Sequence, residues 1–409
     1  MPSREKLEQY AEVLVNVGLN VQKGQPVHIG APLEAADFVH ILAEKAYDAG
    51  AYQVDIDWHS PVIRHLRMNR ESMDALSDVP AWAVRKQEEL CEKNTAFLVV
   101  DAEDPDLLAD ISPERIAVHA RAWGTAFKEA NRNFMEDRVS WLVCSIPTVS
   151  WAKKMFPQLS ETDALQKLWD AIFHVMRMDQ DDPVGAWHNH LDALERRSQF
   201  MNSHHFKKLH YTAPGTDLTI ELPELHTWLA ARSINGKGTS FVANMPTEEV
   251  FTLPKKDGVQ GVVRSTMPLA YNGTVIEGIE LTFERGRITK YHATSGLETL
   301  KELIESDDGS HYLGEVALVP HESPISNLNQ LFYSTLFDEN ASCHLAIGKA
   351  YPTCLVGGRD MTEEEQVANG ANDSITHIDF MIGSAELDID GTLEDGSDIA
   401  IFRKGNWVI

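Results

Sequence analysis

The most informative residues are a histidine and an aspartate two positions apart in an apolar segment. Within residues 374–382, His377 and Asp379 alternate with Ile378 and Phe380. Successive side chains of a β-strand point to opposite faces, so a strand here places the imidazole and the carboxylate on one face. Burying both groups without a partner costs free energy, and a first-row metal ion is a partner that both can bind. A solvated strand edge or a simple His–Asp hydrogen bond accounts for the pattern equally well.

A second segment collects similar chemistry. Residues 337–351 contain Glu339, His344 and Tyr351, with small residues between them. Small residues let the backbone approach a site closely. An acid, an imidazole and a phenol in one short stretch therefore favour the metal-site interpretation of the first segment.

Acidic residues also begin apolar runs at two further places in the sequence. Glu315 follows Gly314, and Glu248 and Glu249 follow Pro246. Taken alone, each is better explained as a solvated carboxylate at the start of a strand or helix. The glycine before Glu315 nevertheless indicates a close approach of the backbone at that point.

The elements that must position these residues differ between the two halves of the chain. Residues 3–185 alternate short apolar runs, such as 95–100, with helical patterns, such as 163–178. Strands separated by helices of that length predict βαβ units and a parallel sheet. From Lys207 onward, short β-type runs are separated by turn signals such as Pro214-Gly215 and Asp390-Gly391.

The predicted fold class is therefore α/β. An N-terminal α/β domain with a mainly parallel sheet, residues 1–190, precedes a C-terminal, mostly β (α+β) domain, residues 191–409, which carries the candidate site. A chain of 409 residues is long enough for two such domains.

Composition narrows the classes of partner. The formal net charge is −26, which repels phosphate backbones and anionic lipid surfaces, so we expect neither a nucleic-acid nor a membrane partner. No run approaches the roughly 18 apolar residues that span a bilayer, and the charged N-terminus, with Ser3 as a candidate helix N-cap, is unlike a signal peptide. The four cysteines have no CxxC spacing, which is typical of reduced thiols, and we expect a cytoplasmic location.

Four sequence runs together resemble one known family. These runs are NMPTEEVFT, GEVALV, FDENASCHLAIGKAYP and HIDFMIG, in this order. They closely resemble the thermophilic aminopeptidase family of metallopeptidases, the aminopeptidase T and S type. The resemblance covers essentially the whole chain, including VGLNVQKGQPVHI near the N-terminus.

The resemblance implies a set of ligands and a reaction. Two divalent metal ions (Zn, Co or Mn) are expected to be held by six side chains, with Tyr351 beside them: Glu249, Glu315, Glu339, His344, His377 and Asp379. Glu315 is our candidate for the bridging carboxylate, Tyr351 for a hydrogen-bond donor to the oxyanion, and Glu248 for a proton shuttle or, equally, an exposed acid. The implied protein is a homodimeric metalloaminopeptidase that removes N-terminal residues from small peptides with a metal-activated water.

Two other classes of function stay open at this point. One is a different two-metal hydrolase, an amidase or a phosphoesterase; Lys349 is the only cation close in sequence to the predicted ligands, which argues against a phosphate clamp. The other is a non-catalytic metal-binding assembly protein. Its structural metal sites tend to be closed and rich in cysteine, unlike this acidic set.

Overall fold

The structure is a computed structural model that describes residues 1–102, 104–271 and 273–409. It divides into two compact units, one of residues 1–190 with 232–246 and the other of residues 191–231 with 247–409. The sequence-based division at residues 190 and 191 did not anticipate that 232–246 joins the first unit. That each half folds as an independent domain stays a prediction.

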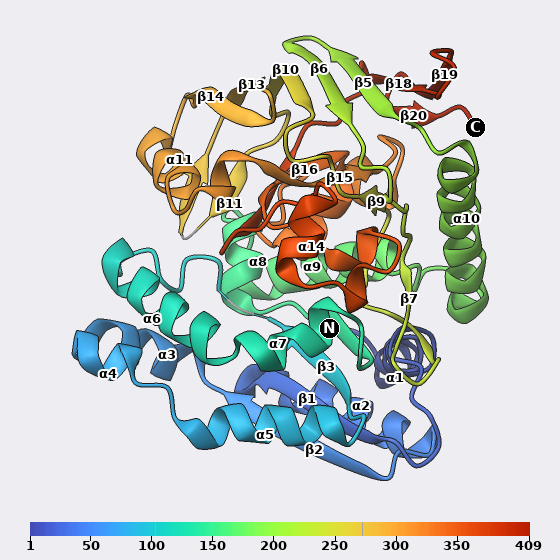
Figure 1. The fold of residues 1–409 in the computed structure, drawn as a ribbon. Helices are drawn as coiled ribbons and strands as arrows, with labels where there is room; N and C mark the ends of the chain where they lie inside the picture. Colours follow the sequence, from blue (N-terminus) through green and yellow to red (C-terminus); the bar gives the residue numbers. More distant parts are fainter. Residues whose placement is uncertain (103, 272) are drawn as a thin grey trace. The chain divides into compact units, whose positions relative to one another are not determined.

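The first unit contains a four-stranded sheet in the order β2-β1-β3-β4, with every neighbouring pair parallel (Figure 1). The predicted α/β architecture with a parallel sheet is therefore confirmed. In β1, the side chains of Val27, Ile29 and Ala31 are buried while their neighbours are less so. The strands of this unit are β1 (Pro26–Pro32), β2 (Gln53–His59), β3 (Ala96–Asp101), β4 (Trp141–Ser145), β7 (Arg232–Ile234) and β8 (Ser240–Val242).

Helices separate the four parallel strands along the chain, as βαβ connections require. Ser3 is the N-cap of the first helix, and its hydroxyl accepts a hydrogen bond from the backbone N–H of Lys6, as the sequence predicted. The helices are α1 (Arg4–Glu12), α2 (Ala36–Asp48), α3 (Pro61–Arg70), α4 (Met73–Ser77), α5 (Ala81–Glu92), α6 (Pro113–Ala126), α7 (Lys128–Met135), α8 (Val149–Met155), α9 (Glu161–Val175) and α10 (Pro183–His204).

Helix α10 is a feature that the sequence patterns did not reveal. It runs for 22 residues and contains the boundary between the two units at residues 190 and 191. His188 lies exposed on this helix, as expected for a histidine without a ligand role. None of the described helices has the length and apolar character needed to cross a membrane.

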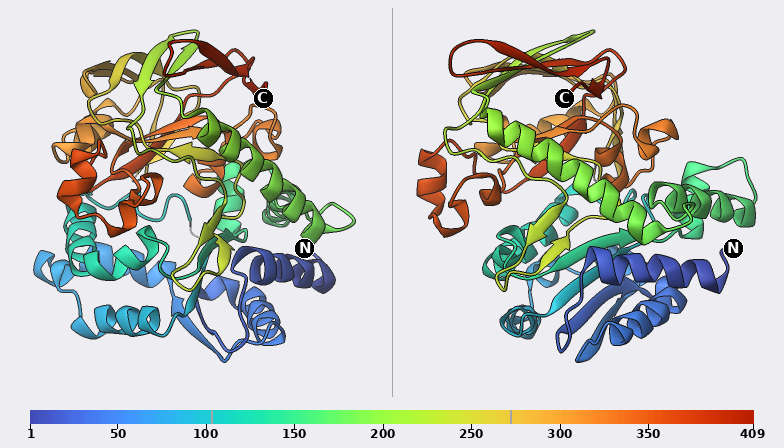
Figure 2. Two further views of the ribbon diagram at one scale, coloured as in Figure 1. Left: turned by 45° about the vertical axis from the view of Figure 1, so that its right-hand side comes forward. Right: turned by 90° about the vertical axis from the view of Figure 1, so that its right-hand side faces the viewer.

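The second unit is mostly β, as predicted, and its strand pairs are antiparallel. An eight-stranded sheet has the order β14-β13-β10-β6-β5-β18-β19-β20, and a four-stranded sheet has the order β17-β16-β15-β9 (Figures 1 and 2). The strands are β5 (Lys208–Ala213), β6 (Thr216–Glu221), β9 (Val250–Thr252), β10 (Val259–Arg264), β11 (Leu269–Tyr271), β12 (Thr274–Ile276), β13 (Glu280–Glu284), β14 (Arg287–His292), β15 (Leu313–Leu318), β16 (His344–Gly348), β17 (His377–Met381), β18 (Asp388–Thr392), β19 (Asp398–Arg403) and β20 (Asn406–Trp407). Its helices are short: α11 (Leu297–Ile304), α12 (Pro324–Asn327), α13 (Thr335–Asp338) and α14 (Glu363–Ala368).

The two sheets of the second unit share one hydrophobic core. Alternate residues of β15, β16 and β17 enter it, including Val316, Leu345 and Phe380. Leu209 and Leu218, from the eight-stranded sheet, belong to the same core. One face of the four-stranded sheet is therefore packed against the other sheet, and the opposite face is left to carry polar side chains.

Candidate metal centre

Four of the predicted site residues lie on the face of the four-stranded sheet that points away from this core: Glu315, His344, His377 and Asp379. The strand register pairs Glu315 with Ala346, and Ala346 with Asp379, so the three form a row across β15, β16 and β17. Paired residues project to the same face. The methyl group of Ala346 leaves space between the two carboxylates, so small residues here keep the site open as the sequence suggested.

A β-bulge at Gly314 brings Glu315 to this face. Leu313 pairs with Ile347 and Glu315 with Ala346, which leaves Gly314 as the extra residue. A Cβ atom on Gly314 would lie 2.3 Å from the carbonyl oxygen of Lys349. Only glycine fits this approach, which explains the glycine that precedes the glutamate in the sequence.

The side chains form two groups of ligand atoms that share Glu315. In one group, Nε2 of His344 lies 3.2 Å from Oε2 of Glu249 and 3.8 Å from Oε1 of Glu315. In the other, Nε2 of His377 lies 3.1 Å from Oε2 of Glu315 and 3.5 Å from Oδ1 of Asp379. The ligand atoms of each group lie within 4.8 Å of one another. The two oxygens of Glu315 thus face different histidines, as a bridging carboxylate requires.

Backbone carbonyls orient both imidazoles. Nδ1 of His344 lies 3.0 Å from the carbonyl oxygen of Ser342, and Nδ1 of His377 lies 2.7 Å from that of Lys349. An Nδ1–H donated to a carbonyl leaves Nε2 as the ligand atom, and both Nε2 atoms face carboxylates. Sequence patterns cannot show these partners, because they are main-chain atoms brought close by the fold.

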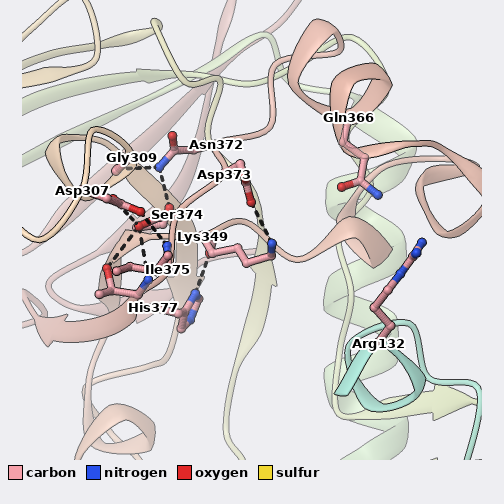
Figure 3. A network of polar contacts seen from close by, with 12 residues as sticks. Arg132, Asp307, Gly309, Lys349, Gln366, Asn372, Asp373, Ser374, Ile375 and His377 are labelled. Atoms are coloured by element: carbon pink, nitrogen blue, oxygen red, sulfur yellow. Dashed lines mark hydrogen bonds and ion pairs between the residues drawn. The ribbon is translucent and has the colours of Figure 1, made fainter. Parts of the chain in front are cut away.

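A polar network holds the start of the strand that carries His377 (Figure 3). Oδ2 of Asp307 accepts the backbone N–H of Ile375 at 2.7 Å, and Oδ1 accepts the hydroxyl of Ser374 at 2.8 Å. The backbone N–H of Lys349 donates to the carbonyl of Thr376 at 2.7 Å. Hydrogen bonds therefore fix both the segment before His377 and Lys349, whose carbonyl oxygen orients the imidazole.

The groups around both histidines shift their pKa values upward, against the effect of burial. Burial lowers the pKa of His344, but Glu249 and the other carboxylates outweigh it and raise the pKa to about 10. For His377, burial also opposes protonation, while Tyr351, Asp379 and Glu315 raise the pKa well above its ordinary value. With no metal bound, both imidazoles therefore carry protons that a divalent cation would have to displace.

The pKa values of the buried acids shift in different directions, as expected where several carboxylates share one site. Burial raises the pKa of Glu315 and, together with Asp379 and Glu249, raises that of Glu339 well above the ordinary range. Burial acts in the same direction on Asp379, but His377 outweighs it and the pKa is lowered. Oδ1 of Asp379 is buried and has no hydrogen-bond donor among the described residues. This unsatisfied oxygen, the two Nε2 atoms that face carboxylates and the several acids of the site fit divalent metal ions.

The other predicted site residues lie close by but outside the two groups. Glu339, in the short 3-10 segment Glu339–Ala341, is near enough to Asp379 and Glu249 to interact with their charges. The ring of Tyr351 lies 4.7 Å from that of His377, centroid to centroid. Glu248 is buried and interacts electrostatically with Arg197, rather than forming part of either ligand group.

Comparison with known proteins gives consistent results. The family model described as "Thermophilic metalloprotease (M29)" matches residues 3–407. "Aminopeptidase AmpS" of Bacillus subtilis (strain 168) is 49% identical over 403 residues, 98% of this chain and 98% of that protein. "Aminopeptidase 2" of Geobacillus stearothermophilus is 47% identical over the same shares of both chains. The solved structure "Wild-type AmpT from Thermus thermophilus" superposes with a TM-score of 0.93 at 39% identity, covering 99% of this chain and 100% of that one.

Proposed function

The chain belongs to the thermophilic metalloprotease family and is a metal-dependent aminopeptidase, and from this premise we propose that two divalent ions are held by its two ligand groups. The observation that carries the proposal is Glu315, whose two oxygens face different histidines. The proposed ligands are Glu249, Glu315, Glu339, His344, His377 and Asp379. Family membership favours the peptidase over the phosphoesterase and the non-catalytic protein that the residues alone left open.

The ions would supply Lewis acidity and water of lowered pKa. The chain's own residues then bind and orient the peptide. Tyr351 supports this division of roles: although His377 lowers its pKa, burial and the nearby carboxylates raise it above the ordinary value. A phenol that keeps its proton at neutral pH can donate a hydrogen bond to the oxygen of the scissile carbonyl as negative charge develops there.

Glu248 is our candidate for carrying a proton to the leaving amine. Its backbone N–H is held by the side chain of Asn340, with an N···O distance of 2.8 Å. Glu248→Gln, which keeps the shape but cannot accept a proton, should lower kcat by at least ~100-fold with little change in metal content. Wild-type activity in this variant would assign the proton transfer to another group.

The experiment for the activity as a whole is metal removal and return. The purified protein is stripped with chelator and assayed on an amino-acid p-nitroanilide before and after addition of Co²⁺, Zn²⁺ or Mn²⁺. We expect no cleavage without metal and full recovery with at least one of these ions. Cleavage that survives stripping would contradict the proposal, as would failure of every ion to restore it.

We also propose a homodimer in the cytoplasm acting on small peptides. The four cysteines are all free thiols, which is consistent with a reducing compartment. Light scattering on the purified protein should give twice the mass of 45.7 kDa. A ladder of peptide lengths tests the substrate, with long peptides expected to be cleaved more slowly than dipeptides and tripeptides.

A further inference from the structure

Asn340 is a fully buried polar residue at the site that is not one of the proposed ligands. Its side chain is 0% exposed. Oδ1 accepts the backbone N–H of Glu248 at 2.8 Å, and Nδ2 donates to the carbonyl oxygen of Leu336 at 3.0 Å and to Oε1 of Glu339 at 3.3 Å. Every one of these partners lies in the second unit.

These bonds permit a single orientation of the amide. An amide nitrogen can only donate and an amide oxygen can only accept. Turning the Asn340 side chain over would set its oxygen against two other acceptors, the carbonyl of Leu336 and the carboxylate of Glu339. The bonds to Leu336 and Glu339 stay within the chain segment that carries Asn340, while the bond to Glu248 reaches a separate part of the site.

Through its bonds to Glu248 and Glu339, Asn340 joins the segments that carry two of the proposed ligands. One bond holds the backbone immediately before Glu249, and the other holds the carboxylate of Glu339. In the absence of this amide, Glu339 would be free to change rotamer, because the structure gives its carboxylate no other hydrogen bond among the described residues. Its burial beside Asp379 and Glu249 would favour turning away from them.

We propose that Asn340 is a positioning residue that turns the carboxylate of Glu339 toward the metal ions and fixes its distance from Glu249. With Oε1 occupied by the amide N–H, Oε2 is the oxygen left to bind an ion. This inference rests on the proposed role of Glu339 as a ligand. Groups that orient metal ligands in this way commonly affect metal affinity by about 10- to 100-fold.

The test is Asn340→Asp, which keeps the shape and the acceptor for Glu248 but removes the donor to Glu339. The stripped full-length protein is titrated with Zn²⁺ against a chromophoric chelator. We expect the dissociation constant to rise by about 10- to 100-fold. Unchanged affinity in the folded variant would overturn the inference.

Asn235→Asp is the matched control. Asn235 is also buried, at 3% exposed; its Oδ1 accepts the backbone N–H of Lys237 at 2.9 Å and its Nδ2 donates to the hydroxyl of Ser140 at 2.9 Å. It lies in the first unit and bonds to no proposed ligand. This variant should lose stability without a change in metal affinity, which separates a positioning role from a general cost of burying a charge.

A double-mutant cycle with Glu339→Gln shows whether Asn340 acts through Glu339. In that background, Asn340→Asp should change affinity by less than about 3-fold, because coupled residues are not additive. Equal effects in both backgrounds would overturn the inference. If Asn340→Asp does not fold, Asn340→Ala replaces it in the cycle with the same two outcomes. If Glu339→Gln alone leaves affinity unchanged, the proposed ligand set is wrong instead.

Discussion

Two clusters of histidine and carboxylate side chains lie in the two units, and they differ in what balances their charge. In the first unit, His28 on β1 lies 3.0 Å from Asp55 and 3.5 Å from Asp57 on β2, and Nζ of Lys86 on α5 lies 3.1 Å and 2.5 Å from the same two acids. In the second unit, no lysine or arginine among the described residues forms an ion pair with Glu249, Glu315 or Asp379.

Spacing alone does not separate the two clusters, because the ligand atoms of each lie within 4.8 Å. The clusters differ in the burial of their acids and in the presence of Lys86 beside the first cluster. The side chains of Asp55 and Asp57 are 41% and 57% exposed, whereas those of Glu315 and Asp379 are 6% and 9% exposed. In the first cluster, water solvates the carboxylates and the ammonium group of Lys86 balances part of their charge. The second cluster is buried, and its negative charge requires a bound cation.

The largest effect should come from removing a ligand of the buried cluster. His344→Ala or Asp379→Ala should weaken metal binding by more than the ~100-fold typical of indirect ligand partners, and activity should be lost with it. Metal analysis after gel filtration, alongside the p-nitroanilide assay, measures both. His28→Ala is the matched change in the first unit and should leave metal content and activity unchanged. If His28→Ala also released metal, the contrast between the clusters would be wrong.

Metal affinity should rise steeply with pH. The pKa of His344 is raised to about 10 and that of His377 is raised as well, so both must lose protons when a metal binds. Each displaced proton increases affinity by about tenfold per pH unit below the raised pKa. Titration calorimetry between pH 6 and pH 8, in buffers of different ionisation enthalpy, counts the protons released. A pH-independent affinity would show that the metal-free histidines are neutral.

His226 gives the opposite case, a buried histidine with no carboxylate in hydrogen-bond contact. Its Nδ1 lies 2.7 Å from the carbonyl of Pro223, and burial lowers its pKa from 6.5 to about 4. As the pH falls, the unfolded chain takes up a proton on His226 before the folded chain does. The free energy of unfolding is therefore unaffected by His226 above pH 6.5 and falls between pH 6.5 and 4, by up to about 3 kcal/mol. Urea unfolding at pH 7.5 and pH 5 measures it. His226→Asn should flatten this pH dependence, and an unchanged slope would assign it to other groups.

The smallest effect is expected for Lys86→Met. The partners of Lys86 are largely exposed, so the free energy of unfolding should fall by at most about 1 kcal/mol. Without its ammonium group, His28, Asp55 and Asp57 should bind Zn²⁺ weakly, seen as a rise in Tm between micromolar and millimolar metal that the wild-type protein does not show. Absence of any such gain would mean that exposure, and not the lysine, distinguishes the two clusters.

The sequence predicted the architecture and part of the site for identifiable reasons. Alternation in β17 places His377 and Asp379 on one face, and Phe380 on the other enters the core as expected. Period-two patterns are local, so they can be read from one segment. The row of Glu315, Ala346 and Asp379 depends on the register between strands far apart in the chain, which a local pattern does not show. Identification of the glutamates as site residues therefore depended on the family resemblance.

Other features depend on contacts that no pattern displays. The carbonyls of Ser342 and Lys349 that orient the histidines belong to the main chain, and any residue type would supply them. Asn340 is next to Glu339 in the sequence, but its proposed role could not be inferred from that. It depends on the hydrogen bond to the backbone of Glu248, which the fold brings close. Helix α10 spans the residues between the two predicted patterns, from Pro183 in its first turn to His204, where no turn signal or strand pattern marked it.

The bulge at Gly314 has a consequence for how this strand tolerates insertion and deletion. Leu313 enters the core, and simple alternation would send Glu315 to the core as well; the extra residue reverses the parity, so that Glu315 faces the ligands. An in-frame loss of the codon for residue 314 would therefore remove the bulge and still leave Leu313 and Glu315 on opposite faces of the strand, because adjacent strand residues alternate. Loss of the codon for a paired residue such as Val316 would instead turn the residues that follow it to the wrong face of the sheet.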